Sequence, residues 1–398
     1  MSTEWNDSAR AVDPIIALMD TYNRDPRTEK INLGVGVYQD DLAETPVFQA
    51  VKDAEARLLE EQNTKTYVGV GGDSALVEAI RAEIFSNTSS SVTGIQGVGG
   101  SGALRLIAEF CGEVAPEATL WVSQPTWGNH FALFAASGLP CKAFPWRAFD
   151  CEGIVDGALD ALADAKSGDF IILHACCHNP TGIDLPGDEL DALCDAINAK
   201  GLVPIIDAAY VGFADGFEAD ARALGGLADR FPVAFTAFSA SKNFALYRER
   251  LGVAFISAHN KSKLNAWQTI LLSAARCAYS MPPDHGAAVV RTILTDPQLR
   301  ASWLHDLDIA RNRVADLRHT FATTLRDVGV SFATNYIAQG AGLFALLPLT
   351  REQAHHLRED MGIYLLDNGR VNIAGLRRDT IPRVVEAVAA LDRASQPA

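Results

Sequence analysis

A lysine with phosphate-binding neighbours stands at the end of an apolar run. The run Val233–Phe238 is rich in β-forming residues and is followed by Ser239, Ser241 and Lys242. Lysine becomes an amine nucleophile where burial or a nearby cation lowers its pKa, and it then forms Schiff bases with carbonyls, pyridoxal phosphate among them. Arg250 follows eight residues later, and two hydroxyls with one guanidinium are suitable donors for a phosphate. A lysine in such a position is more often an ordinary solvated lysine, so the hypothesis that Lys242 forms a Schiff base depends on residues elsewhere in the chain.

Polar residues follow two other apolar runs in the same way. Asn179 comes shortly after Phe170–Ala175, and Asp207 and Tyr210 come directly after Leu202–Ile206. In open α/β sheets, ligands bind outside the carboxyl ends of the strands. We therefore expect these side chains to gather with the lysine at one edge of a sheet, whereas residues kept only for core packing would be scattered along the strands.

A glycine-rich turn supplies a second candidate for phosphate binding. The residues Gly100, Ser101 and Gly102 stand where a turn leads into a helix that is predicted to continue to Glu113. Unpaired N–H groups and the positive end of the helix dipole favour an anion at such a position. The stretch matches neither a Walker A motif nor a complete dinucleotide-binding motif, and by itself a glycine-rich turn is a weak signal.

The same residues would suit the ring of pyridoxal phosphate. An aspartate beside the ring nitrogen keeps it protonated, and Asp207 is our candidate, although an aspartate here could also simply cap a turn. Tyr210 and Asn179 could hydrogen-bond the phenolic oxygen of the ring. Trp127 could stack on its face, although an aromatic residue is more often part of the core.

Two arginines are candidates for binding a substrate. Once an amino acid has displaced Lys242 from the cofactor, the free amine can move a proton between the substrate and the cofactor, which is the chemistry of transamination. A carboxylate is best bound by the planar fork of an arginine. We expect Arg370 to bind the α-carboxylate and Arg276 to bind a side-chain carboxylate.

The order of apolar segments predicts an α/β fold. Uninterrupted apolar strands separated by helices are typical of a mostly parallel sheet that is covered by helices on both faces. The strands are expected at Thr119–Val122, Phe170–Ala175, Leu202–Ile206, Val233–Phe238 and Gly252–Ile256.

The two ends of the chain have a different pattern of expected strands and helices. A strand interrupted by two glycines is expected at Ile31–Tyr38. After a long helical region that ends near Val328, short strands are expected at Leu343–Leu347, Tyr364–Leu366 and Val371–Ile373. This alternation predicts a smaller α+β domain.

Composition narrows the class of protein and its location. With 34 basic and 49 acidic residues, the formal charge of −15 disfavours binding to nucleic acid or to an anionic membrane surface. No apolar stretch is long enough to span a bilayer, and residues 1–10 do not resemble a signal peptide. The seven cysteines are scattered without metal-binding spacing, so neither a metal site nor disulfides are expected, and a reducing cytoplasm is the expected compartment.

Several motifs together resemble one family. The chain resembles the aspartate and aromatic amino acid aminotransferases, which are class I, fold-type I pyridoxal-phosphate enzymes, in the same order over nearly its whole length. The motifs are Asn179-Pro180-Thr181-Gly182, Asp207-x-x-Tyr210, Ser239-x-Ser241-Lys242-Asn243, Tyr247-x-x-Arg250-x-Gly252 and Gly369-Arg370-Val371-Asn372-Ile373-Ala374-Gly375.

The resemblance implies roles for further residues. It implies that Lys242 carries the cofactor, that His130 supports Asp207, and that the backbone at Gly36 helps to hold the substrate carboxylate. It also implies a homodimer with shared active sites, in which Tyr67 reaches the phosphate in the other subunit and Arg276 crosses the interface to bind a distal carboxylate.

The expected domains follow from the same resemblance. Residues 1–14 would form an N-terminal arm, residues 15–45 together with 310–398 the small domain, and residues 46–309 the large domain that binds pyridoxal phosphate.

Departures from the family pattern bear on the substrate. Met281 and Thr66 stand where aspartate-specific relatives usually have asparagine, and Ser101 is typical of members that accept aromatic substrates. Val37 and Thr45, in contrast, are typical of aspartate enzymes. We therefore expect both aspartate and aromatic amino acids (tyrosine, phenylalanine) as donors and 2-oxoglutarate as the acceptor.

Two alternative functions remain at this point. A pyridoxal-phosphate-dependent β-lyase or decarboxylase would use the same Lys242 and Asp207, but it would have little use for a distal cation such as Arg276. A non-catalytic sensor fused to a DNA-binding module is disfavoured because no spare basic N-terminal domain is found.

Overall fold

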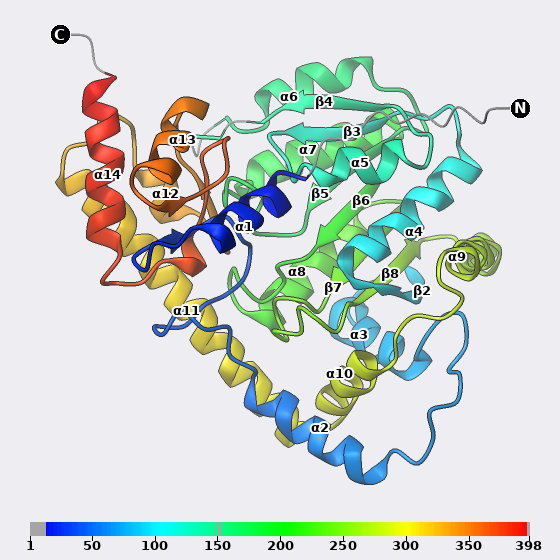
Figure 1. The fold of residues 1–398 in the computed structure, drawn as a ribbon. Helices are drawn as coiled ribbons and strands as arrows, with labels where there is room; N and C mark the ends of the chain where they lie inside the picture. Colours follow the sequence, from blue (N-terminus) through cyan, green and yellow to red (C-terminus); the bar gives the residue numbers. More distant parts are fainter. Residues whose placement is uncertain (1–12, 147, 150–152, 396–398) are drawn as a thin grey trace, which may run out of the picture.

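One large sheet forms the centre of the molecule (Figure 1). The computed structural model describes residues 13–146, 148–149 and 153–395. The strand order of the seven-stranded sheet is β2-β8-β7-β6-β5-β3-β4, and every strand is parallel to the others except β8, which is antiparallel to both of its neighbours. The strands are β2 (Ser91–Val98), β3 (Leu120–Gln124), β4 (Cys141–Pro145), β5 (Phe170–His174), β6 (Val203–Ala208), β7 (Val233–Ser239) and β8 (Leu251–Ala258).

Both faces of this sheet are buried, which explains the uninterrupted apolar runs. Within β5, Ile171 and Leu173 belong to one hydrophobic cluster, whereas Phe170 and Ile172 belong to another. The second cluster includes residues of α4 (Gly99–Val114), α5 (Asn129–Ala135) and α9 (Leu264–Ala278). The first includes residues of α3 (Ser74–Phe85), α6 (Asp156–Ala161), α7 (Gly187–Lys200), α8 (Phe217–Asp229) and α10 (His285–Thr295). The predicted α/β fold with helices on both faces is confirmed.

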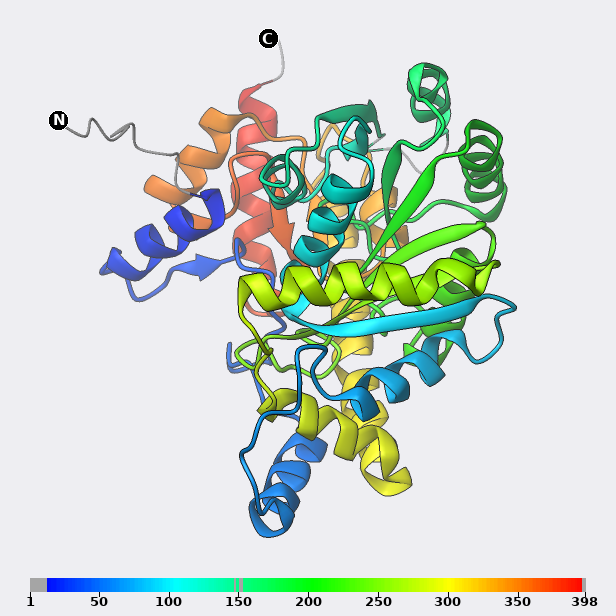
Figure 2. The same ribbon diagram turned by 90° about the vertical axis from the view of Figure 1, so that its right-hand side faces the viewer.

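The strand β2 forms one edge of the sheet, and helices α3, α4 and α9 contact it. In Figure 2, helix α9 (yellow-green) runs alongside β2 (cyan), and residues of the two elements are in contact. None of the described helices is long and apolar enough to cross a membrane.

Segments from both ends of the chain lie together beside the large sheet (Figure 1). Strand β1 (Ile31–Asn32) pairs with β10 (Ile363–Tyr364), and β9 (Phe344–Leu346) pairs with β11 (Arg370–Asn372). Helix α11 (Pro297–Asp327) extends from this region, where it contacts α12 (Asn335–Gln339) and α14 (Ile381–Ala394), to α2 (Gln49–Glu61) and α10. The remaining helices of this region are α1 (Pro14–Arg24) and α13 (Arg351–Glu359).

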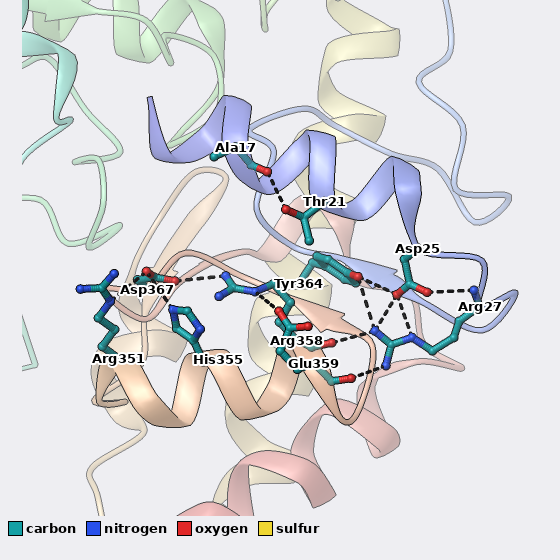
Figure 3. A network of polar contacts seen from close by, with 10 residues as sticks. All are labelled: Ala17, Thr21, Asp25, Arg27, Arg351, His355, Arg358, Glu359, Tyr364 and Asp367. Carbon is teal, nitrogen blue, oxygen red and sulfur yellow. Dashed lines mark hydrogen bonds and ion pairs between the residues drawn. The ribbon is translucent and has the colours of Figure 1, made fainter. Parts of the chain in front are cut away.

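A polar network fastens the segment after α1 to the C-terminal helices (Figure 3). Arg27 donates hydrogen bonds of 2.9 Å to the backbone oxygens of Arg358 and Glu359, at the C-terminal end of α13. Asp25 accepts from Arg27 Nε at 2.7 Å and from the Tyr364 hydroxyl at 2.6 Å. Because Arg27 binds carbonyls that lack partners within α13, the N-terminal segment is held against the C-terminal part of the chain.

The strand predicted over Ile31–Tyr38 is wrong beyond Asn32. The carbonyl oxygens of Val35 and Val37 accept hydrogen bonds from the Asn372 side-chain amide at 2.7 and 2.8 Å. Side chains from the C-terminal part thus take the place of a neighbouring strand, so that the backbone bends instead of continuing the ladder.

Candidate active site

A cavity lies at the carboxyl ends of β5, β6 and β7, with about 440 Å³ of free space. This is where the sequence predicted that the polar residues would meet. The lining residues are Gly100, Ser101, Leu104, Trp127, Asn179, Asp207, Ala209, Tyr210, Ser239, Ser241, Lys242 and Arg250.

The amine of Lys242 is poised to react inside this cavity. Its Nζ atom lies 5.2 Å from the centre of the Tyr210 ring. Desolvation lowers the pKa of Lys242 to about 8; Asp207 opposes this effect, whereas Arg250 and Arg370 add to it. At neutral pH, a larger fraction of this amine is therefore unprotonated than of a solvated lysine.

Asp207 is a buried, ionised carboxylate held by a histidine. His130 Nε2 lies 3.0 Å from Asp207 Oδ2, and the Thr126 hydroxyl lies 2.9 Å from His130 Nδ1. Burial alone would raise the pKa of Asp207, but the hydrogen bond from His130 and the nearby His174 and Lys242 bring it below its usual value. A carboxylate in this state can keep a ring nitrogen protonated.

His174 adds a third potential metal ligand, but the bonding does not favour a metal. Ligand atoms of His130, His174 and Asp207 lie within 4.8 Å of one another. Both ring nitrogens of His130 already have partners, Asp207 on one side and Thr126 on the other. The pKa of His174 is lowered to about 4 by burial, so this ring is neutral at physiological pH. The geometry fits support of Asp207 better than metal binding.

Asn179, Tyr210 and Arg370 form a connected group. The Asn179 amide donates to the Tyr210 hydroxyl at 3.4 Å, and Arg370 Nη1 donates to Asn179 Oδ1 at 3.3 Å. Burial raises the pKa of the Tyr210 phenol, which therefore stays protonated. Arg370 Nη2 donates to the Gly34 carbonyl at 2.8 Å.

Arg370 retains a free donor although it is buried. Only 3% of the residue is exposed, its Nε atom has no hydrogen-bond partner, and within the described ranges it forms no ion pair. Burial lowers its pKa to about 10, so the guanidinium is charged at neutral pH. A buried charged donor without a partner is unfavourable and suits an anionic ligand. Arg370 also lines a second cavity that shares Trp127 and Asn179 with the first.

The start of α4 and the loop before β8 form a cradle for an anion. Arg250 Nη1 donates to Ser241 Oγ at 3.3 Å, and the Ser241 N–H donates to Ser239 Oγ at 3.3 Å. Gly99 has φ +71°, and a Cβ atom there would overlap the Arg250 guanidinium. At Gly100 a Cβ atom would lie 2.9 Å from Ser239 Cβ. Glycine at both positions lets the backbone at the start of α4 lie close to the Arg250 guanidinium and to Ser239. Backbone N–H groups and the guanidinium can then bind the same phosphate.

Six predicted residues do not line this cavity, and two of them, His130 and Arg370, are the positioning and second-cavity residues described above. A Cβ atom at Gly102 would face Val98 at 3.1 Å, so this glycine serves the packing of α4. Gly36 lies against the Phe344 ring, where a Cβ atom would come within 2.6 Å of Cζ. Tyr67 is 87% exposed, and Arg276 is exposed on α9 and hydrogen-bonded to Ser280. For Tyr67 and Arg276, the role in a neighbouring subunit stays a prediction.

Sequence reasoning missed Thr126, His174 and Phe344. Thr126 stands four residues before His130, a separation that gives no signal unless the turn between them is known. The ring of Phe344 lies 4.2 Å from the centre of the Arg370 guanidinium, but in the sequence it is one apolar residue within an apolar strand.

A buried reactive amine, an ionised aspartate and an anion cradle at one sheet edge define a site of the pyridoxal-phosphate type. The chain matches the family model of aminotransferase class I and II over residues 28–388. It therefore belongs to the class I and II aminotransferase family, and it is an aminotransferase that uses pyridoxal phosphate.

Both aromatic-amino-acid and aspartate aminotransferases are similar to this protein over nearly the whole chain. An aromatic-amino-acid aminotransferase of Pseudomonas aeruginosa is 40% identical, over 95% of this chain and 96% of that protein. An aspartate aminotransferase of Escherichia coli is 37% identical, over 97% and 99%. Among solved structures, an aromatic-amino-acid aminotransferase from Burkholderia pseudomallei, covalently bound to pyridoxal phosphate, has a TM-score of 0.92 at 34% identity and covers 98% of this chain and 100% of that one.

Proposed function

We propose that the protein transfers the amino group of aspartate and of aromatic amino acids to 2-oxoglutarate, with Lys242 as the residue that bonds to the cofactor. The observation that carries this proposal is the cavity in which the Lys242 amine, with its pKa lowered to about 8, shares one space with Asp207 and Arg250. Relatives of both kinds, aromatic and aspartate aminotransferases, are similar to this chain.

Different residues of the chain bind the cofactor ring and move the substrate proton. When bound, pyridoxal phosphate supplies an aldehyde that bonds to amines and a ring that withdraws electrons from them. Asp207 would hold a proton on the ring nitrogen, and Tyr210 and Asn179 would hydrogen-bond the phenolic oxygen. Trp127 covers one face of the ring. Lys242, once released by the incoming amino acid, would take the proton from the substrate α-carbon and would return it to the cofactor carbon two bonds away, across the nitrogen.

The phosphate is held by hydroxyl and backbone donors together with one arginine. The hydroxyls of Ser239 and Ser241 and the fork of Arg250 bind its oxygens, and the N–H groups at Gly100 and Ser101 bind it from the start of α4. Support comes from the glycine cradle, which a side chain would fill.

Arg370 binds the α-carboxylate of the substrate. Support comes from its unpartnered Nε, which is a free donor, and from Asn179 and Trp127, which line both the cavity of Lys242 and the one that Arg370 lines. Because every substrate carries an α-carboxylate, this contact orients aspartate and phenylalanine alike.

We also propose a homodimer in which Arg276 and Tyr67 complete the partner's site. The Val68 N–H lies 3.3 Å from Met281 Sδ, so the loop that carries Tyr67 and the segment that follows Arg276 share one surface. An apolar Met281 there would tolerate an aromatic ring beside the cation that binds dicarboxylates. We further propose a cytoplasmic location and three parts of the chain: an N-terminal arm at residues 1–14, a small domain at residues 15–45 with 310–398, and a large domain at residues 46–309. Residues 1–12 of the arm lie outside the described residues.

Half-reactions test the function directly. The loaded protein, mixed with aspartate or phenylalanine without any oxo acid, should lose the absorbance of the lysine-bound cofactor and yield an equal amount of oxaloacetate or phenylpyruvate. Lys242→Ala should bind the cofactor without bonding to it and should give no oxo acid. Release of pyruvate, ammonia or carbon dioxide would instead indicate a lyase or a decarboxylase.

A further inference from the structure

Arg318 is a buried cation held by backbone oxygens alone. It lies on α11, is 2% exposed and forms no ion pair with any residue that the structure describes. Nη1 donates to the carbonyl of Ile337 at 3.1 Å, and Nη2 donates to those of Ala341, Gly342 and Phe344 at 3.1, 2.8 and 2.6 Å. We call these four oxygens the carbonyl cluster. The carboxylate of Asp184 acts on this guanidinium only from beyond ion-pair distance, so the cluster is needed to keep the buried charge in place and is in turn fixed by it.

The carbonyl cluster leads directly to the residue beneath Arg370. Phe344, whose own carbonyl belongs to the cluster, has its ring 4.2 Å from the Arg370 guanidinium and 5.9 Å from the Tyr210 ring. Arg370 also pairs with Leu346 in the antiparallel β9–β11 ladder. The position of Arg370 therefore depends on β9 twice, through the ladder and through the aromatic ring.

The same cation adjoins the turn that carries Asn179. Gly182, three residues later with φ +71°, accepts a hydrogen bond from the Ala341 N–H at 2.7 Å. A Cβ atom at Gly182 would lie 3.0 Å from Arg318 Nη2 and would overlap the Phe344 carbonyl. The turn after β5 and the segment before β9 are thus packed against each other around Arg318. Asn179 on this turn contacts Arg370, which lies on β11, the strand that pairs with β9.

We propose that Arg318 is a positioning residue for carboxylate binding: by holding the carbonyl cluster, it fixes Phe344 under Arg370 and keeps the free edge of Arg370 turned toward the substrate. The inference rests on the proposed role of Arg370. Arg318 itself touches neither substrate nor cofactor.

Ligand binding to the pyridoxal-phosphate-loaded protein tests the proposal. The probes are succinate and 3-phenylpropionate, which carry carboxylates but no amine, with affinities measured by calorimetry. Arg318→Met removes the donors and should weaken both probes about tenfold while the dissociation constant for the cofactor changes less than about twofold. Arg318→Lys retains a charged donor and should recover part of the affinity. Arg326→Met is the matched control, because Arg326 is exposed on the same helix, and it should bind both probes normally.

Two further variants keep the outcome decisive. Phe344→Leu leaves the Arg318 donors and the backbone carbonyls in place but removes the ring under Arg370, so it should show the same loss of probe affinity. This variant tests the proposal even if Arg318→Met does not fold. Normal probe binding by either variant, or equal weakening of probes and cofactor, would overturn the inference. Arg370→Lys separates the two proposals: if it binds both probes normally, the proposed role of Arg370 is wrong, whereas a loss confined to Arg370→Lys contradicts the role of Arg318 alone.

Discussion

Lys242 is reactive because of where its amine lies. Removal from water disfavours the ammonium form and is the largest effect, the carboxylate of Asp207 opposes it, and the charges of Arg250 and Arg370 act in the same direction as the removal from water. The pKa falls from 10.5 to about 8, so the amine loses its proton at a lower pH than an ordinary lysine. Only the unprotonated amine attacks an aldehyde.

The bonding of Lys242 to the cofactor should therefore follow a low titration midpoint. In the cofactor-free protein, the rate at which added pyridoxal phosphate becomes bonded, followed by absorbance, should rise with pH through a midpoint of about 8. In Asp207→Asn, the charge that favours the ammonium form is gone, and the midpoint should move to lower pH. A midpoint above pH 10, or a shift upward in the variant, would contradict this account of the amine.

Most of the candidate site could be predicted from residue type and position in the chain. Asn179, Asp207, Tyr210 and Lys242 each follow an apolar run, and parallel strands bring such positions to one edge. Arg318 could not be recognised in this way. Its partners are backbone oxygens, which any sequence has, and only the path of the chain brings four of them to one guanidinium.

At the scale of elements, the start of α4 depends on a glycine in a left-handed conformation. Gly99 has φ +71° and lies against Arg250, whereas Gly226 on α8 is exposed with open space around its Cα. Alanine should therefore change the stability of the fold in opposite directions at the two positions. At residue 99 it would have to leave the left-handed conformation, whereas at residue 226 it only raises the helix propensity.

The same substitution at Gly99 and at Gly226 should affect stability and cofactor binding differently. Gly99→Ala should lower the free energy of unfolding by about 1–2 kcal/mol and weaken pyridoxal phosphate binding, because the new methyl group displaces the Arg250 guanidinium. Gly226→Ala should stabilise the fold by up to about 1 kcal/mol and leave cofactor binding unchanged. Thermal unfolding and cofactor titration measure both effects. Unchanged cofactor affinity in Gly99→Ala would mean that the cradle does not hold the phosphate.

The strands that sequence analysis missed lie at the two edges of the sheet. Strand β2 contains serine, threonine, glycine and glutamine and is only partly buried, and three of the five residues of β4 are exposed, so neither has the apolar run that marks the central strands. The strand predicted over Ile31–Tyr38 ends at Asn32 for another reason: the Asn372 side chain, far away in the sequence, binds the carbonyls of Val35 and Val37. Local pattern predicts pairing only where a neighbouring strand is available.

At the scale of the whole molecule, Tyr67 and Arg276 are turned outward. Neither lines the cavity of its own chain, and Leu59 and Tyr67 are each 87% exposed although they are apolar or aromatic. Exposed residues of this kind suit an interface with a second copy, in which an outward arginine would reach the partner's cavity.

Hybrid dimers test this arrangement. Lys242→Ala lacks the amine and Arg276→Leu lacks the distal cation, so each variant alone should be nearly inactive with aspartate and 2-oxoglutarate. If Arg276 serves the partner's site, mixed dimers contain one complete site, and random reassociation should restore about a quarter of the wild-type rate. No recovery after mixing, with dimers formed, would mean that Arg276 acts in its own chain.

Strand β8 runs against both of its neighbours, and Ser239 at the end of β7 pairs with Gly252 near the start of β8. The chain thus leaves the sheet and re-enters it at facing positions, with Lys242 and Arg250 on the one loop between them. The spacing between the bonding amine and the phosphate-binding guanidinium is consequently set by strand register. Substitutions elsewhere in the chain that keep this register should therefore leave the spacing of the two groups unchanged.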